Sequence, residues 1–303
     1  MSQEKESMSE GASCPSKKLP SRDEVEEIKE SLALQDNLRD VKHKIIVLSG
    51  KGGVGKSTVA ANIAAALSLR GKKVGLVDVD IHGPSIPKIM GLESSRPATS
   101  LDGLEPVQYS PNLVVMSVGF LLRERDDAII WRAPLKHGLI KQFLAEVNWG
   151  ELDYLVVDCP PGTGDEPLSV IQLLENADGA VVVTTPQDLS LADVRKSITF
   201  CRATNLPVLG VVENMSGFIC PHCANTVDIF KSGGGEKMAS EMGAPFLGRI
   251  PIDPKMVESG DSGKPFVESF AESETSKAFI RIIEPLLALA GRIRKEEDYN
   301  ANL

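Results

Sequence analysis

The sequence predicts an α/β fold, in which a mostly parallel β-sheet carries helices on both faces. From residue 44 onward, short runs rich in Val, Ile and Leu alternate with stretches of helical periodicity. These runs are almost continuously apolar, which is typical of strands buried on both faces of a parallel sheet. No internal repeat or clean linker interrupts the alternation after residue 41. The predicted strands are 44–49, 73–78, 112–118, 153–158, 179–184, 207–213 and 245–250.

The chain divides into four predicted segments. Residues 1–21 are rich in Ser, Glu, Lys and Pro and predict a disordered tail, which contains Cys14. Residues 22–41 form a helix and linker, because Val25, Ile28, Leu32 and Leu38 recur at roughly helical spacing. We expect one α/β domain over 42–291 and a charged tail over 292–303.

Composition excludes several classes of protein. An apolar content of 42% suffices for a large core, and a net charge of -9 argues against a broad nucleic-acid surface. No run approaches the roughly 20 apolar residues of a membrane span, and the first ten residues lack the apolar core of a signal peptide. We therefore expect a cytoplasmic protein with no membrane partner. Five cysteines in such a chain favour metal or catalytic use over a disulfide framework.

A glycine-rich stretch follows the first predicted strand and leads into a helical pattern that begins near Thr58. It fits G-x-x-x-x-G-K-[ST] at every fixed position and in the required strand–turn–helix context. Glycines let successive N–H groups point into one concavity, and the helix N-terminus adds positive potential, so the loop predicts a polyphosphate site. A Gly-rich turn without function is the alternative. The stretch consists of Gly50, Lys51, Gly52, Gly53, Val54, Gly55, Lys56 and Ser57.

This motif assigns chemistry to two side chains. Lys56 is expected to reach the β- and γ-phosphates of ATP, and the Ser57 hydroxyl to bind Mg²⁺. Asp158 ends the fourth predicted strand, where an acid can hold Mg²⁺ through its waters. Gly162, four residues later, is predicted to leave its N–H free for a γ-phosphate. A simple strand-end cap is the alternative for Asp158.

Two further acids follow the second predicted strand. Asp80 lies beyond the strand end, where a carboxylate can order an attacking water, and Asp78 is given a supporting role. A turn acid or a helix N-cap would explain Asp80 equally well from its position alone.

A C-x-x-C pair, Cys220 and Cys223, follows the sixth predicted strand. Two thiolates at this spacing can bind one metal site from a single turn. A redox dithiol normally opens a helix in a thioredoxin-like unit, which this context does not match. Zinc remains open as the metal, because thiolates accept it readily and His222 lies between the two cysteines. Cys159 follows a buried strand and is expected to be a small core residue.

The string GKGGVGKS resembles the deviant Walker A motif of the MinD, nitrogenase iron protein and Mrp group of ATPases. The resemblance implies a P-loop NTPase fold of that type and a homodimer in which Lys51 reaches the partner's nucleotide. Asp80 then matches the switch I aspartate that positions water, and the Asp-x-Pro-Pro-Gly spelling from Asp158 resembles switch II. Asn214 matches an adenine contact, and the loop containing Pro251 and Asp253 looks like the one that closes over the base.

Together with Cys220 and Cys223, these motifs resemble the Mrp/ApbC family of iron-sulfur cluster carriers over about residues 42–290. The resemblance implies an ATPase that assembles a [4Fe-4S] cluster at a dimer interface and transfers it to apo iron-sulfur proteins. Some relatives carry four cysteines in an N-terminal extension, whereas this tail has only Cys14. A MinD/ParA-like positioning ATPase is the second hypothesis, although it has no use for the two cysteines. A zinc-stabilised nucleotide switch is the third.

Overall fold

The computed structural model describes residues 22–100, 103–121, 133–174, 176–220, 223 and 225–290. The predicted tails at 1–21 and 292–303, with Cys14, and also His222, lie outside these residues. The described residues form an eight-stranded sheet in the order β12-β9-β8-β1-β7-β2-β6-β5, parallel except for the β5–β6 pair. Its strands are β1 Val41–Ser49, β2 Val74–Asp78, β5 Val107–Ser110, β6 Leu113–Ser117, β7 Leu152–Asp158, β8 Gly179–Thr184, β9 Val208–Glu213 and β12 Phe246–Arg249.

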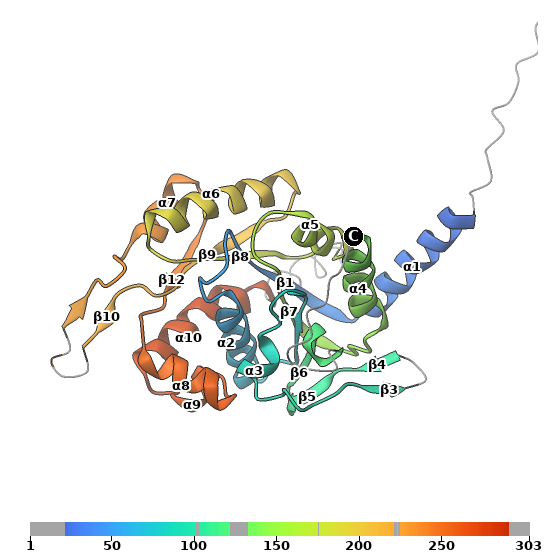
Figure 1. The fold of residues 1–303 in the computed structure, drawn as a ribbon, viewed down its shortest axis with the longest axis horizontal. Helices are drawn as coiled ribbons and strands as arrows, with labels where there is room; N and C mark the ends of the chain where they lie inside the picture. Colours follow the sequence, from blue (N-terminus) through green and yellow to red (C-terminus); the bar gives the residue numbers. More distant parts are fainter. Residues whose placement is uncertain are drawn as a thin grey trace, which may run out of the picture.

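Helices cover both faces of this sheet, as predicted (Figure 1). α2, α3, α8, α9 and α10 lie on one face, and α4, α5, α6 and α7 lie on the other. Their bounds are α2 Lys56–Leu69, α3 Ile86–Ile89, α4 Ala133–Glu146, α5 Asp165–Leu173, α6 Asp188–Ala203, α7 Gly234–Glu241, α8 Pro254–Ser262, α9 Phe266–Ser269 and α10 Glu274–Leu287. A 3₁₀ turn, Val118–Leu121, follows β6. Within the described residues, no helix is both long and apolar enough to cross a bilayer.

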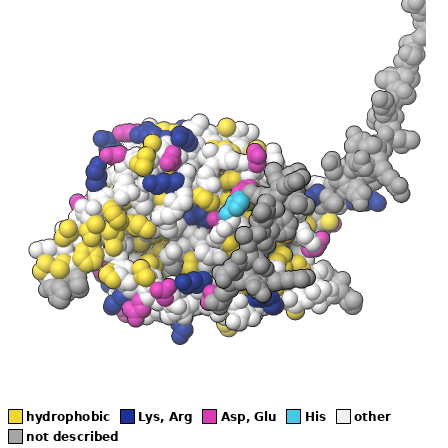
Figure 2. Space-filling view, viewed as in Figure 1, with side chains coloured by type: hydrophobic (Ala, Val, Ile, Leu, Met, Phe, Trp, Pro, Cys, Tyr) yellow, Lys and Arg dark blue, Asp and Glu magenta, His cyan; other side chains and the backbone are white. Residues whose placement is uncertain are grey.

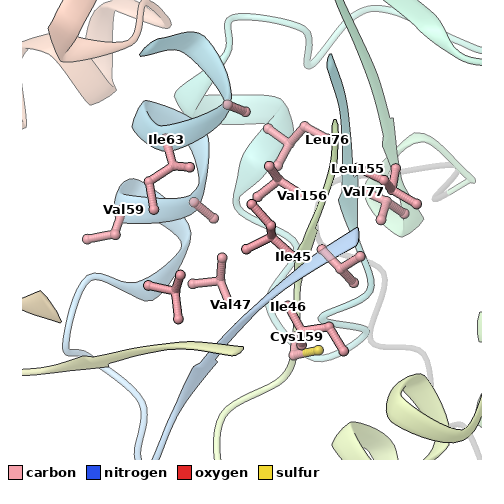
Figure 3. Packing of buried hydrophobic residues seen from close by; sticks show 14 of the residues in the cluster. Ile45, Ile46, Val47, Val59, Ile63, Leu76, Val77, Leu155, Val156 and Cys159 are labelled. Carbon is pink, nitrogen blue, oxygen red and sulfur yellow. The ribbon is translucent and has the colours of Figure 1, made fainter. Parts of the chain in front are cut away.

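The core lies between α2 and the central strands. Figure 3 shows Val59 and Ile63 of α2 facing Ile45 and Val47 of β1, and all four side chains are fully buried. β1, β2, β7 and β8 are buried at nearly every position because helices cover both of their faces. This packing fixes the strand ends that carry the polar motifs.

The N-terminal helix α1 spans Arg22–Leu38, the range that the spacing predicted. It packs against α4 through buried Leu34 and Leu38. Leu32, one of the apolar residues whose spacing predicted this helix, does not pack against the domain, since it is 55% exposed. The Asn37 side-chain amide donates to the carbonyls of Leu144 (2.9 Å), Ala145 (3.2 Å) and Val147 (2.7 Å), and so caps the C-terminal end of α4.

Two small hairpins were not predicted. One pairs β3 Ala98–Ser100 with β4 Gly103–Glu105. The other pairs β10 Phe218–Ile219 with β11 Thr226–Val227 and extends away from the sheet at one end of the molecule (Figure 1). We call residues 217–230 the cysteine arm, because Cys220 and Cys223 lie at its tip. The N–H of Cys220 donates to the Asn225 carbonyl at 3.0 Å, which continues the ladder toward the tip.

Candidate functional site: a phosphate loop beside a cysteine arm

The polar motifs of the sequence meet at one edge of the sheet. β1, β2, β7 and β9 are mutually parallel, so the residues that follow them lie at the same side. Ligands of open α/β sheets bind at this edge, beyond the carboxyl ends of the strands. The phosphate loop, Asp80, Asp158 and Asn214 all follow such strand ends.

The phosphate loop has the backbone shape that its glycines allow. Gly53 and Gly55 have φ values of 79° and 82°, a region that strains other residues. A Cβ added at Gly52 or Gly53 would meet nothing within 4 Å, so the loop is uncrowded at these two positions. Gly50 has the opposite constraint, because a Cβ there would lie 2.5 Å from the backbone carbon of Asp193. The loop is therefore uncrowded at Gly52 and Gly53 and closely packed against α6 at Gly50.

Lys56 is the charged centre of the site. Its ammonium lies 2.6 Å from Asp158 Oδ1 and 3.9 Å from Asp80 Oδ2, and it donates to Ser57 Oγ at 3.3 Å. Lys56 is 6% exposed and Asp158 is fully buried. The structure thus brings together Lys56, Asp158 and Asp80, which the sequence assigned to phosphate binding, Mg²⁺ binding and water positioning.

Burial and mutual charge shift the pKa values of this cluster. Burial, followed by repulsion from Asp158, raises the pKa of Asp78 to about 8, against the opposing effect of Lys56. Burial also raises the pKa of Asp158, although its pairing with Lys56 opposes the shift. Burial alone would lower the pKa of Lys56, but attraction and a hydrogen bond to Asp158, together with attraction to Asp80 and Asp78, outweigh burial and the pKa rises. The lysine therefore stays charged where three acids converge.

The residues present fit a hard cation such as Mg²⁺. Asp158 Oδ2 is buried and has no hydrogen-bond partner among the described residues. An unsatisfied buried carboxylate oxygen is costly unless a cation or a water fills its coordination. Together with the adjacent Ser57 hydroxyl, it supplies the oxygen ligands that Mg²⁺ prefers.

Asp78 connects the strand end to the loop that carries Asp80. The oxygens of its carboxyl group accept from Ser117 Oγ at 3.0 Å, from the N–H of Asp80 at 3.1 Å and from the N–H of Ile86 at 3.3 Å. These bonds hold both ends of the 80–86 turn against β2 and β6. A positioning role agrees with the supporting role that the sequence suggested.

One detail of the sequence prediction is wrong. The N–H of Gly162 was expected to be free, but it donates to the Ser49 carbonyl at 2.8 Å. Its φ of 98° turns the 158–165 loop back toward the phosphate loop, which satisfies the N–H within the protein. Contact between this N–H and a phosphate would require that bond to break.

A cavity of about 400 Å³ adjoins the phosphate loop. The Asn214 side chain lies at its wall and donates from Nδ2 to the Val54 carbonyl at 2.9 Å, so this amide also supports the loop. Gly55 is required here, because a Cβ would lie 2.3 Å from that Nδ2. The other lining residues are Thr58, Ser85, Lys88, Ile89, Met215, Phe230, Pro251, Ile252, Asp253, Met256, Val257, Gly260 and Asp261.

Lys51 and the cysteine pair lie at the surface. The Lys51 side chain is half-buried, and its ammonium has no hydrogen-bond or ion-pair partner in the part of the chain that the structure describes. Cys220 is half-buried and Cys223 is exposed, whereas Cys159, as predicted, and Cys201 are buried. Among the described residues, no group of three or more His, Cys, Asp or Glu side chains could hold a metal. A site at the arm would need ligands beyond the two cysteines.

Sequence reasoning missed Glu213 and Phe230. The fully buried Glu213 carboxylate accepts from the Gly233 N–H at 2.8 Å, and from Ser216 Oγ and the Gly235 N–H. It therefore ties the chain that returns from the arm to the end of β9. This contact explains the glycine at position 235, since a Cβ there would lie 2.8 Å from Glu213 Oε2, but the Gly-Gly-Gly run does not identify Glu213 as the partner. No sequence signal marked Phe230.

Comparisons with known proteins agree with this geometry. The model of a ParA family described as NUBPL iron-transfer P-loop NTPase matches residues 40–287. An iron-sulfur cluster carrier protein of Methanocaldococcus jannaschii is 50% identical over 272 residues, covering 88% of this chain and 94% of that protein. A cytosolic Fe-S cluster assembly factor NUBP2 homolog of Monosiga brevicollis is 52% identical over 268 residues, with the same coverage.

Solved structures share the fold. A nucleotide-binding protein of Archaeoglobus fulgidus in complex with ADP, described with cobalt, is 42% identical with a TM-score of 0.72, covering 82% of this chain and 96% of that one. The cell division ATPase MinD of Pyrococcus furiosus is 26% identical with a TM-score of 0.61, covering 82% of this chain and all of that one. The chain is thus similar to a group of nucleotide-binding proteins over nearly their whole lengths.

Proposed function

The chain belongs to the NUBPL iron-transfer P-loop NTPases and to the Mrp/ApbC family of iron-sulfur cluster carriers, and from this premise we propose that it couples ATP hydrolysis to assembly and transfer of a [4Fe-4S] cluster. One observation carries the proposal. Cys220 and Cys223, both accessible to solvent, lie on an arm rooted beside the cavity of a phosphate loop. The same part of the fold would therefore hold both the nucleotide site and the thiolate site.

ATP binding and hydrolysis would depend on the phosphate loop and the charged residues around it. The N–H groups of residues 50–58 and the Lys56 ammonium would bind the triphosphate, which competes with Asp158 for that ammonium. Ser57 and Asp158 would hold Mg²⁺, which neutralises charge on the phosphate oxygens. Asp80, 8% exposed and 3.9 Å from the lysine, would orient the attacking water. Lys51, half-buried and unpaired among the described residues, would reach the nucleotide of a partner protomer.

The base would occupy the cavity beside the loop. Asn214, Pro251 and Asp253 line it, and the Asn214 amide keeps one N–H and its oxygen for a base edge. Gly162 would exchange its bond with Ser49 for a γ-phosphate contact, which would make the 158–165 loop sensitive to that phosphate.

The cluster is the cargo, and its ligand count requires a second chain. A [4Fe-4S] cluster takes four thiolates, whereas one arm offers two. A two-fold homodimer presents the same arm twice, so two C-x-x-C turns meeting at the axis supply the full set. The recipients would be apo iron-sulfur proteins, and the similarity to a cytosolic assembly factor supports a cytosolic site of action.

Anaerobic reconstitution with iron and sulfide tests this function. We expect the parent to gain the broad visible absorption of a [4Fe-4S] cluster and to hold about four irons per dimer. Cys220→Ala and Cys223→Ala should each lose the cluster, whereas Cys14→Ala and Cys201→Ala should keep it. Zinc at one per dimer with no iron uptake would instead support the zinc-stabilised switch and refute the carrier.

A further inference from the structure

The cavity beside the phosphate loop is built partly from the cysteine arm. Gly55 and Thr58 line its phosphate side, whereas Phe230, the last residue of the arm, lines it from the arm side. Phe230 is 40% exposed, so part of its ring is not packed in the core and is free to contact a ligand. Figure 2 shows hydrophobic side chains gathered at this end of the molecule, and the exposed ones on the arm are Ile219, Val227, Ile229 and Phe230.

The cavity wall near Phe230 has the chemistry of a site for a flat heterocycle. Ile89, Met215, Ile252, Met256 and Val257 line it, and Val257 is 68% exposed. Apolar and thioether groups suit the faces of a nucleobase, and an aromatic ring adds stacking that does not depend on the base edge. Phe230 is the aromatic side chain among the lining residues.

Both strands of the arm are attached to the main domain, the outgoing one at a residue of the cavity wall. On the outgoing strand, Phe218 forms a β-bridge with Ile252, and the Ile252 N–H donates to the Gly217 carbonyl at 2.7 Å. Ile252 itself lines the cavity, and Cys220 comes two residues after Phe218. On the returning strand, Phe230 is followed by Lys231, whose ammonium lies 2.6 Å from Asp188 Oδ2 on α6.

We propose that Phe230 is a base-contacting residue through which a bound nucleotide holds the cysteine arm in place. Stacking of the base on Phe230 restricts the motion of the returning strand. Because β10 and β11 are paired, the motion of Cys220 and Cys223 is restricted as well. By linkage, a metal or cluster held at the cysteines then tightens nucleotide binding by the same factor. The inference rests on the proposed nucleotide function, and it adds a residue and a route that the phosphate loop alone does not provide.

Titration calorimetry on the metal-free, reduced full chain separates base from phosphate. ATP and tripolyphosphate, which lacks the base, are each titrated in the presence of Mg²⁺. Phe230→Ala should weaken ATP binding about tenfold, roughly 1.4 kcal/mol, and leave tripolyphosphate binding unchanged. Ile229→Ala is the matched control, since Ile229 is 53% exposed on the same arm and does not line the cavity, and it should change neither affinity. Equal ATP affinity in Phe230→Ala and the parent would overturn the contact, as would an equal loss for tripolyphosphate.

Alkylation of Cys223 measures the order of the arm. In the parent, saturating ATP should slow the reaction of this exposed thiol about fivefold, and tripolyphosphate should not. In Phe230→Ala, saturating ATP should give no such protection, whereas Ile229→Ala should behave as the parent. Full protection by ATP in Phe230→Ala would refute the coupling. If the parent binds neither ATP nor tripolyphosphate, the nucleotide site itself is refuted, an outcome distinct from failure at Phe230.

Discussion

Lys56 pairs with Asp158 in a buried site, and each residue depends on the other. Removal of one partner of a buried pair leaves an uncompensated charge, which typically costs about 3–5 kcal/mol. We expect Lys56→Ala to lower ATP affinity by at least about a hundredfold, equivalent to roughly 2.8 kcal/mol, and to lower the free energy of unfolding. Calorimetry and urea unfolding measure the two effects. The double variant Lys56→Ala/Asp158→Asn should recover stability without recovering binding, and unchanged ATP affinity in Lys56→Ala would remove the phosphate assignment.

Asp80 should separate binding from hydrolysis. Asp80→Asn keeps the size of the side chain but weakens its ability to accept a proton from water. ATP should still bind, whereas steady-state turnover should fall at least about tenfold, or roughly 1.4 kcal/mol of barrier. Phosphate release assays on both proteins check this. Equal turnover would assign the water-positioning role elsewhere.

Burial of the Cys201 thiol should make the free energy of unfolding depend on pH. Burial raises the pKa of this thiol from 9.0 to about 11. Between those values the unfolded chain loses a proton that the folded chain keeps, so this thiol's contribution to stability falls as pH rises through the window. Urea unfolding of Cys201→Ala should therefore show a shallower loss of stability from pH 9 to 11. Cys223→Ala, at the exposed tip, is the control, and identical slopes in parent and Cys201→Ala would contradict the burial argument.

At the scale of elements, α1 is held to the domain by a cap. Asn37 supplies one amide to three carbonyls at the end of α4. We expect Asn37→Ala to lower the free energy of unfolding by about 1–2 kcal/mol, because those carbonyls lose their partner. Thermal unfolding should show a fall of a few degrees, roughly 2–4 °C per kcal/mol for a domain of this size. Asp36→Ala, exposed on the same helix, should have little effect, and equal shifts in the two variants would deny the cap.

Most of the sheet could be predicted from the sequence because its strands are local apolar runs. The seven predicted strands correspond to β1, β2, β6, β7, β8, β9 and β12. β5 escaped prediction because Val107–Ser110 is a partly exposed edge strand of mixed polarity, and its pairing with β6 is antiparallel. β10 and β11 are two residues each, too short to leave a periodicity.

The same distinction applies to the site. Lys56, Asp80 and Asp158 could be predicted because each belongs to a motif at a strand end. Glu213 and Phe230 could not, since their partners come from chain segments brought together only by the fold, such as the Gly233 N–H and the cavity wall. The bond of the Gly162 N–H to Ser49 likewise depends on how two loops meet, which spacing does not encode.

At the scale of the whole molecule, the proposal predicts that one chain is an incomplete carrier. Each arm brings two thiols, and no larger group of metal-ligating side chains exists among the described residues. Lys51, half-buried and without a partner there, points to the same second chain from the nucleotide side. The cluster site and the nucleotide site would therefore both be completed by the second chain at one two-fold interface.

Native mass spectrometry of the anaerobically reconstituted protein tests this claim most directly, since it reads protomer number and iron content in one species. We predict that the parent protein is a dimer that carries one [4Fe-4S] cluster. The Cys223→Ala variant should carry no cluster. A monomer holding a complete cluster at micromolar dilution would contradict the shared site.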